Sequence, residues 1–268
     1  MGRVGEGAKV SCMSDILKSY PVVALKQVSP VYFRLAFAAP GLARVVKPGQ
    51  FIHIKVSEGF EPFFRRPFSV YRAHDGIVEI FFEPVGKGSR LLTSKKRGDT
   101  LDVLGPLGKP FTPPAAGIKQ IVFIGGGIGA APFMLFSDRI KVHKAEKLLL
   151  YGGRSKAHTF SMTDFKKNGV RVLTATDDGS VGVKGRVSEL FKEIRLAPAT
   201  MIYTCGPRPM MAAVQAFAKV HDLRGEASCE EVMACGLGAC LGCSIPTVHG
   251  YRTVCHDGPV FGLNELVF

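Results

Sequence analysis

The sequence predicts a β plus α/β protein, in which an antiparallel β-barrel is followed by a doubly wound parallel sheet and a small cysteine-containing module. Three observations predict this order. Short strand-like runs separated by turn residues occupy the first part of the chain. A glycine cluster then introduces apolar runs that alternate with segments long enough for helices. Four cysteines gather near the end of the chain, between Cys235 and Cys255.

The barrel is predicted over residues 15–114, after a small, polar and flexible tail at residues 1–14. Runs of alternating or aromatic residues occur at 31–37, 51–56 and 77–82. Several short strands with regular turn signals are typical of a small antiparallel barrel. The turn residues that separate the runs are Pro40-Gly41, Pro48-Gly49, Asp75-Gly76 and Arg97-Gly98-Asp99.

The α/β domain is predicted over residues 115–222, after the Pro113-Pro114 dipeptide that ends the barrel. Four short apolar runs in this part are typical of buried parallel strands. They lie at residues 120–124, 147–151, 170–174 and 200–204. A segment long enough for a helix follows each of the first three, and this alternation predicts a doubly wound sheet. Residues 223–268 are left for the cysteine-containing module.

A glycine-rich turn follows the first of these strands, at residues 124–132. Gly125, Gly127 and Ala130 nearly match the G-x-G-x-x-G/A pattern. Glycines let backbone N–H groups approach a pyrophosphate, and the following helix N-terminus adds partial positive charge. The acidic residue expected after the second strand is absent, and Gly152-Gly153-Arg154-Ser155-Lys156 stands there. The turn therefore predicts a nucleotide site that differs from the standard Rossmann site, and a tight turn without a ligand is the alternative.

The four C-terminal cysteines have a spacing that predicts an iron–sulfur cluster. Cys235, Cys240 and Cys243 form C-x4-C-x2-C, and Cys255 follows after eleven residues. Plant-type [2Fe–2S] clusters are held by this pattern, and the intervening glycines let the backbone wrap closely around the cluster. A structural zinc site is an alternative, but it usually pairs two short C-x2–4-C arms across a longer gap. Disulfides are disfavoured because no apolar secretory segment is evident.

The composition narrows the class of protein. The chain has 268 residues, of which 46% are hydrophobic, enough for packed cores. No apolar run reaches the roughly 18 residues of a membrane-spanning helix, so we expect a cytoplasmic protein that does not span a membrane. The net charge of +13 is spread along the chain, with one tight basic run at Lys95-Lys96-Arg97. Without a nucleic-acid motif, this charge indicates a surface that faces anionic cofactors or an acidic partner.

Read together, the motifs resemble those of the ferredoxin–NAD(P)H reductase superfamily. Arg66-Pro67-Phe68-Ser69 resembles its R-x-[YF]-S flavin motif, and Gly86-Lys87-Gly88-Ser89 resembles its second flavin loop. Residues 125–132 resemble its nicotinamide-nucleotide loop, and residues 205–210 resemble its C-G-P-x-x-M segment. With the cysteine loop and the ending at residues 254–261, the chain resembles the electron-transfer subunit of type 1B, NAD-dependent dihydroorotate dehydrogenase from residue 15 onward.

The resemblance implies three cofactors, FAD, NAD and a [2Fe–2S] cluster, and it assigns no catalytic residue. The residues implied to hold FAD are Arg66, Pro67, Phe68, Ser69, Phe81, Phe82, Glu83, Gly88 and Ser89. Those implied to hold NAD are Gly125, Gly126, Gly127, Gly129, Cys205, Gly206 and Pro207. The implied metal ligands are Cys235, Cys240, Cys243 and Cys255.

The residue types suit these roles, although simpler explanations exist. Arg66 offers a fixed cationic fork for phosphate, and its alternative is a surface salt bridge. Ser69 offers a hydrogen bond near the flavin N5, and its alternative is an ordinary strand serine. Gly88 and Ser89 offer an amide and a hydroxyl to the pyrophosphate, or they form a simple turn. Residues 81–83 either hold FAD through their strand backbone or are plain barrel residues.

The resemblance also implies a function. Dihydroorotate reduces FMN in a catalytic partner subunit, and electrons then pass through the cluster and FAD to NAD⁺ during de novo UMP biosynthesis. We expect a heterotetramer with two copies of each subunit, in which Met233-Ala234 and the cysteine loop face the partner. The chain alone is not expected to oxidise dihydroorotate.

Several alternatives stay open at this point. A flavin and iron–sulfur subunit of an NADH-dependent ferredoxin:NADP reductase or sulfide dehydrogenase complex would share all three parts. A zinc-stabilised interaction protein would leave the motifs at residues 66–69 and 125–132 unexplained. Arg154 and Lys156 could meet a 2′-phosphate and so favour NADP, whereas the resemblance favours NAD. Residues 177–180 either contact the nucleotide or form a solvated turn.

Overall fold

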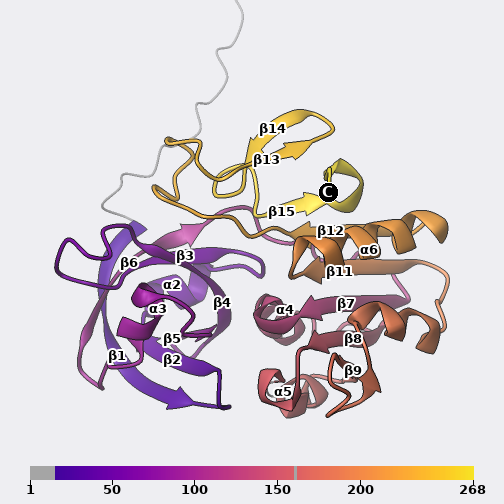
Figure 1. Ribbon diagram of the computed structural model, residues 1–268, viewed down its shortest axis with the longest axis horizontal. Coiled ribbons are helices and arrows are strands. Elements are labelled where there is room, and N and C mark those ends of the chain that lie inside the picture. Colours follow the sequence, from indigo (N-terminus) through magenta and orange to yellow (C-terminus); the bar gives the residue numbers. More distant parts are fainter. Residues whose placement is uncertain (1–15, 160–161) are drawn as a thin grey trace, which may run out of the picture.

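The computed structural model describes residues 16–159 and 162–268. Figure 1 shows a β-barrel beside a parallel sheet, with the C-terminal segment lying across one end of both. The predicted order of barrel, α/β domain and C-terminal module is confirmed. The tail predicted at residues 1–14 lies outside the described residues. Within the described ranges, no helix has the length and apolar character needed to cross a membrane.

The barrel closes from antiparallel strands in the order β1-β2-β5-β4-β3-β6. Their bounds are β1 (Leu17–Gln27), β2 (Phe33–Ala38), β3 (Phe51–Lys55), β4 (Arg66–His74), β5 (Ile77–Phe82) and β6 (Thr100–Leu107), with helices α2 (Pro40–Val45) and α3 (Lys87–Leu92) in the connections. Side chains alternate between the two faces of a strand. Ile52 and Ile54 of β3 are fully buried in the barrel core, so Phe51 and His53 lie on the outer face of this strand.

The α/β domain is built on a seven-stranded sheet with the order β10-β9-β8-β7-β11-β12-β15. The strands are β7 (Gln120–Gly126), β8 (Glu146–Gly153), β9 (Val170–Thr176), β10 (Val183–Lys184), β11 (Thr200–Cys205), β12 (Arg224–Ser228) and β15 (Val260–Gly262). From β10 to β12 the neighbours pair in parallel, as the buried apolar runs predict. The chain runs outward from β7 to β10 and then returns to β11 on the other side of β7. The strands β7 and β11 therefore flank the topological switch point, where open sheets bind ligands.

Helices cover both faces of this sheet (Figure 1). Phe133 and Phe136 of α4 pack on Phe123 of β7, on the face toward the barrel. Met211 and Val214 of α6 pack on the opposite face. The helices are α4 (Pro132–Arg139), α5 (Met162–Lys167) and α6 (Arg208–Val220), with 3-10 turns η1 (Gly127–Ala130), η2 (Lys156–His158), η3 (Val187–Glu193) and η4 (Leu263–Glu265).

A charged contact joins the barrel to the helices that face it. The guanidinium of Arg72 in β4 lies 3.1 Å from a carboxylate oxygen of Asp138 in α4 and 3.4 Å from one of Asp164 in α5. The three side chains are largely buried. An arginine held by two carboxylates in a partly desolvated interface fixes the orientation of the two domains better than an exposed pair would.

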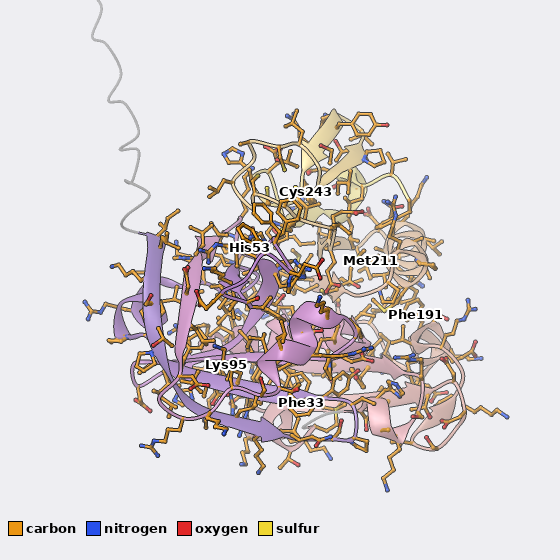
Figure 2. The ribbon with its side chains drawn as sticks, turned by 60° about the vertical axis from the view of Figure 1, so that its left-hand side comes forward. Phe33, His53, Lys95, Phe191, Met211 and Cys243 are labelled. Carbon is orange, nitrogen blue, oxygen red and sulfur yellow. The ribbon has the colours of Figure 1, made fainter. Side chains whose placement is uncertain are left out.

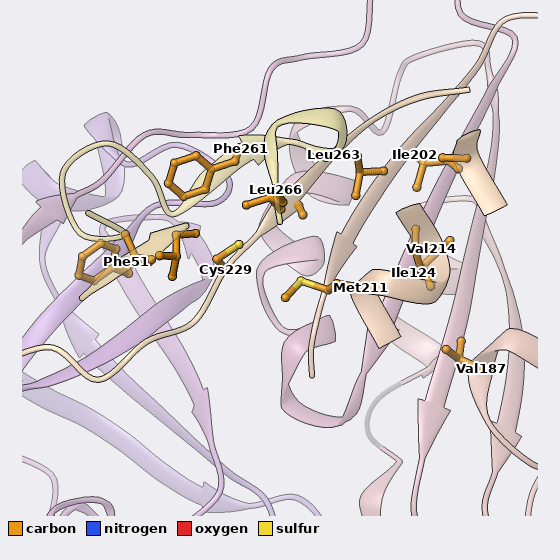
Figure 3. Packing of buried hydrophobic residues seen from close by; sticks show 14 of the residues in the cluster. Phe51, Ile124, Val187, Ile202, Met211, Val214, Cys229, Phe261, Leu263 and Leu266 are labelled. Atoms are coloured by element: carbon orange, nitrogen blue, oxygen red, sulfur yellow. The ribbon is translucent and has the colours of Figure 1, made fainter. Parts of the chain in front are cut away.

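The C-terminal module is bonded into the α/β sheet. Its strand β15 pairs antiparallel with β12, while β13 (Ser244–Thr247) and β14 (Gly250–Thr253) form a separate hairpin. One buried cluster includes residues of all three parts, among them Phe51 of the barrel, Met211 of α6 and Phe261 of β15, and Phe261 lies near Phe51 in Figure 3. The sheet thus continues on both sides of the boundary predicted at residues 222–223, and the division into four segments stays a prediction.

Candidate functional site

A cavity of about 390 Å³ opens where the barrel, the parallel sheet and the C-terminal segment meet. This volume lies within the range of about 300–1,000 Å³ that is common for small-molecule sites. All nine residues predicted to hold FAD line this one cavity. They are Arg66, Pro67, Phe68, Ser69, Phe81, Phe82, Glu83, Gly88 and Ser89.

The topology of the barrel explains why these residues meet. The strands β4 and β5 are antiparallel neighbours, so the first residues of β4 lie beside the last residues of β5. Residues 66–69 and 81–83 therefore share one end of the barrel. The helix α3 begins at Lys87, only a few residues after β5, and brings its first turn to the same place.

Arg66 and its neighbour Arg65 have different surroundings. The Arg65 guanidinium lies 2.9 Å from a carboxylate oxygen of Asp102, and it also donates to the Asp102 carbonyl. Arg66 lines the cavity, and its Nη1 donates to the carbonyl of Phe64 at 2.6 Å. Within the described ranges Arg66 forms no ion pair, so the salt-bridge alternative is not what the structure contains. A guanidinium without a carboxylate at a cavity wall fits an anionic ligand group.

The two turns predicted to bind NAD, at residues 125–129 and 205–207, lie against each other. They follow β7 and β11, the strands that flank the switch point. A Cβ atom on Gly129 would lie 2.5 Å from the carbonyl oxygen of Cys205, so only glycine permits this approach. None of the seven predicted residues lines the cavity, but Ile128 from the first turn does. The structure therefore places the predicted nucleotide turns beside the predicted flavin site.

The basic segment after β8 lies beside the acidic turn after β9. The backbone N–H of Lys156 donates to the hydroxyl of Ser180 at 2.7 Å, and this hydroxyl donates to Asp178 at 2.6 Å. The Arg154 guanidinium lies 3.1 Å from a carboxylate oxygen of Glu83, across the gap between barrel and sheet. Both segments stand at the carboxyl edge of the parallel strands, where a nucleotide is expected.

Sequence reasoning missed one wall of the cavity, residues 228–231 together with Met233. This wall begins where β12 ends, beside β11, at the same carboxyl edge as the nucleotide turns. Recognising residues 224–228 as a parallel strand was the signal that could have found it. Glu230 on this wall lies 3.9 Å from the thiol of Cys205. The prediction that Met233 faces a partner subunit is wrong, because its side chain is buried against the core.

The four predicted metal ligands form two close pairs of thiols. Cys235 interacts with Cys240, and Cys243 interacts with Cys255. An electrostatic interaction between Cys235 and Cys255 links the two pairs. Among the described residues, no three histidine, cysteine or acidic side chains are placed to hold one metal ion, and no cysteine forms a disulfide. Two pairs of thiols suit a cluster of two irons, each of which takes two thiolates.

Backbone N–H groups of the loop point at the sulfurs. Those of Leu237 and Cys240 each lie 3.4 Å from the Cys235 sulfur, and that of Gly238 lies 3.1 Å from the Cys255 sulfur. Burial opposes ionisation of Cys235, but the backbone N–H groups of Leu237 and Cys240, together with the Cys240 side chain, lower the pKa of Cys235 to about 6. The loop reaches this shape through Gly236, which has a φ of 71°. A loop that stabilises thiolates with its own backbone fits an iron–sulfur cluster.

Two protein-family models match parts of this chain. Residues 123–216 match the model of an oxidoreductase NAD-binding domain. Residues 230–267 match the model of the iron–sulfur cluster binding domain of dihydroorotate dehydrogenase B. The fold and these two domains define an oxidoreductase of the ferredoxin reductase-like class with an iron–sulfur module.

Relatives with similar length narrow this class. The chain is 37% identical over 254 residues to the dihydroorotate dehydrogenase B (NAD(+)) electron transfer subunit of Desulforamulus reducens, covering 92% of this chain and 97% of the relative. It is 36% identical over 257 residues to the subunit of the same name from Geobacillus thermodenitrificans, covering 92% and 96%. The chain belongs to the family of dihydroorotate dehydrogenase B electron transfer subunits.

Solved structures show the same architecture. A chain from the structure of an NADH-dependent reduced ferredoxin-NADP oxidoreductase superposes with a TM-score of 0.79 and 27% identity, covering 92% of this chain and 89% of that one. A ferredoxin NADP⁺ reductase from Neisseria gonorrhoeae, with bound FAD and NADP, gives a TM-score of 0.63 at 21% identity, covering 78% and 92%. The second comparison supports the fold alone.

Proposed function

We propose that this chain carries electrons from the FMN of a dihydroorotate dehydrogenase catalytic subunit, through a [2Fe–2S] cluster and FAD, to NAD⁺ in UMP biosynthesis. Its relatives are named as electron transfer subunits of dihydroorotate dehydrogenase B. The observation that supports this most directly is the set of residues that line the cavity. The cavity is lined by the nine predicted flavin residues, by Ile128 of the nucleotide turn, and by Met233 of the segment entering the cysteine loop. FAD bound in this cavity would therefore lie beside both the predicted NAD site and the predicted cluster site.

The chain supplies binding and orientation at this cavity. FAD, when bound, exchanges a hydride with NAD and single electrons with an iron–sulfur cluster. Arg66 would hold a phosphate through its guanidinium, because it has no carboxylate partner within the described ranges. Gly88 and Ser89, in the first turn of α3, would supply further donors to the pyrophosphate, and Ser69 would orient the flavin ring. Residues 81–83 would hold the cofactor through their backbone.

The four cysteines would hold the cluster as thiolates, and the buried ones would keep water from part of it. Cys243 and Cys255 are buried, whereas Cys240 is exposed. The backbone N–H groups that reach Cys235 and Cys255 stabilise the negative charge of the bound thiolates. The adjoining turns at residues 125–129 and 205–207 would hold NAD at the switch point.

The exposed tip of the cysteine loop is the place where we expect the catalytic subunit to dock. Leu241 at this tip is 63% exposed and follows the exposed Cys240. A large apolar side chain beside an exposed ligand is suited to an interface across which electrons pass. We further propose a cytoplasmic heterotetramer with two copies of each subunit.

The direct test is anaerobic purification of the chain with quantification of iron and flavin. About two iron atoms per FAD and a broad visible absorption are expected. The isolated chain should oxidise NADH with artificial acceptors and leave dihydroorotate unchanged, and addition of the catalytic subunit should start dihydroorotate oxidation. Turnover of dihydroorotate by the isolated chain, or a colourless zinc protein, would disprove the proposal.

A second candidate is the small subunit of an NADH-dependent ferredoxin:NADP oxidoreductase, which the 0.79 superposition favours. Both candidates use the same three cofactor sites, so the spectrum does not separate them. Affinity purification of the tagged chain from its own cells separates the two candidates by the partner that is recovered. An FMN protein that oxidises dihydroorotate supports the first candidate, and a larger subunit that reduces ferredoxin supports the second.

A further inference from the structure

His53 is a buried polar side chain of the barrel strand β3. Its exposed fraction is 0%, although it lies on the outer face of the barrel strand β3. Over residues 16–159 and 162–268, neither of its ring nitrogens has a hydrogen-bond partner. A buried N–H group without a partner is costly, and nearly all such groups in proteins are satisfied. This ring therefore points to an acceptor that the described residues do not supply.

The cysteine loop covers this ring. The Nδ1 and Cε1 atoms of His53 lie 2.7 Å from the position that a Cβ atom on Gly236 would occupy, so the imidazole packs directly on the loop backbone next to Cys235. Figure 2 shows His53 at the end of the barrel that faces the segment containing Cys243. The ring of Phe51, two residues earlier on the same face, lies 5.6 Å from the His53 ring and lines the flavin cavity.

The cavity predicted to hold FAD does not supply the acceptor for the His53 ring. Phe51 and Pro67 line this cavity, but among the described residues His53 does not. Burial, and then the positive charges of Arg65 and Arg66, lower the pKa of His53 to about 4. The imidazole is therefore neutral at pH 7 and carries one N–H donor. The loop that packs on the ring is the one that gathers the four cysteines, so a sulfur of a bound cluster is the acceptor that its position suggests.

We propose that His53 donates a hydrogen bond to a sulfur of the iron–sulfur cluster bound by this loop, and so raises the reduction potential of the cluster. This inference rests on the cluster assigned under the proposed function. Gaining an electron adds negative charge that is shared by the sulfurs, and an N–H donor stabilises this charge more than it stabilises the oxidised form. His53 thus favours electron entry at the iron–sulfur site, next to the wall of the flavin cavity.

The experiment is a redox titration of the full chain with FAD and cluster bound, followed by EPR and visible absorption at one pH. His53→Leu keeps a similar volume and removes the donor. At the potential where half of the wild-type cluster is reduced, we expect its ratio of reduced to oxidised cluster to fall about three- to tenfold. Tenfold corresponds to 59 mV for one electron. His53→Gln retains a donor and should recover most of this loss.

Two controls separate this role from packing. His249→Leu makes the same substitution at an exposed position of the same module, and it should leave the ratio unchanged. The flavin potentials, read in the same titration, should also stay at their wild-type values. A His53→Leu protein with full iron content and an unchanged cluster potential overturns the inference and leaves the proposed function intact.

A second measurement covers the case in which His53→Leu fails to retain the cluster. Pulsed EPR of the reduced wild-type chain labelled with ¹⁵N-histidine should show a weak nitrogen coupling, which His53→Gln labelled in the same way should lack. Absence of histidine coupling in the wild type overturns the inference. A wild-type chain that binds no cluster overturns both the inference and the proposed function.

Discussion

The flavin cavity and the cysteine loop are neighbours, but they are assembled in different ways. The cavity takes its wall from the barrel, from the turn after β7 and from the segment after β12, which lie far apart in the sequence. The loop positions its sulfurs mainly with its own backbone N–H groups. The first site therefore needs the complete fold, while the second is specified by a short stretch of sequence. Substitutions should empty one site without emptying the other.

The largest expected effect is loss of the cluster in Cys243→Ser. Cys243 is 2% exposed, and its sulfur is 3.4 Å from the backbone nitrogen of Cys255, so water cannot easily replace it as a ligand. We expect dihydroorotate-dependent NAD⁺ reduction in the assembled complex to fall more than about 100-fold. FAD content and NADH oxidation with ferricyanide should stay near wild type. Cys12→Ser, outside the ligand pattern, is the control, and retention of iron by Cys243→Ser would contradict the assignment.

The converse experiment is Arg66→Ala, which should weaken FAD binding and leave the iron content unchanged. Loss of a charged hydrogen bond to phosphate should lower FAD affinity about 10- to 100-fold. Equilibrium titration of the deflavinated protein measures this change. Arg65→Ala is a matched control, because the Arg65 guanidinium is already engaged by Asp102. Equal losses of affinity in the two variants would remove the role proposed for Arg66.

An intermediate effect is expected where the barrel strand β3 contacts the cysteine loop. Gly236 and Gly250 have φ angles of 71° and 88°, so alanine is strained at both. Only Gly236 lies against a neighbour, the His53 ring, whereas Gly250 has open space around its missing side chain. We expect Gly236→Ala to lower the free energy of unfolding by about 1–3 kcal/mol more than Gly250→Ala. Equal losses in chemical unfolding would mean that the ring does not restrict the loop.

The smallest expected effect concerns Glu226 in β12. Its carboxylate accepts a hydrogen bond from the Thr112 backbone at 2.9 Å, and burial raises its pKa. A carboxyl group with a raised folded pKa binds its proton more tightly in the native state. Stability is therefore lost as the pH rises from the ordinary glutamate value through the raised one.

Glu226→Gln stays neutral and should avoid this loss. We expect it to be more stable than the wild type near about pH 8, by less than about 1 kcal/mol, with a smaller difference near about pH 5. Thermal unfolding at both pH values measures this. Glu58→Gln, at a side chain that is 88% exposed, is the control. A difference that grows toward low pH would reverse the sign of the argument.

The sequence predicted the elements whose pattern is local. The runs at 51–56, 77–82 and 120–124 alternate or stay apolar over their whole length, and strands begin at Phe51, Ile77 and Gln120. The pairing of the three-residue strand β15 with β12 was not predicted, because no local pattern tells which sheet edge a short strand joins when the chain returns from a distant segment.

The difference between local and long-range signals also explains which site residues the sequence predicted. The motif at residues 66–69 and the cysteine spacing are contiguous signals, so they could be read directly. His53 occupies an outward position of a half-buried strand, which predicts an exposed side chain. It is fully buried, and the cysteine loop, far along the chain, packs directly on its ring. Residues 228–231 were missed for the same reason, since their place depends on β12 pairing with β11.

The antiparallel strand β15 has a consequence for how the protein is made. Ribosomes deliver β12 before the cysteine loop and the β13–β14 hairpin, and β15 follows last. Until then β12 presents an open edge, which is a template for pairing with other chains. Supply of iron and sulfide during synthesis should therefore govern solubility as well as colour. In a nascent chain whose cysteine loop stays unfolded, β15 pairs with β12 late. The edge of β12 is then exposed to other chains for longer.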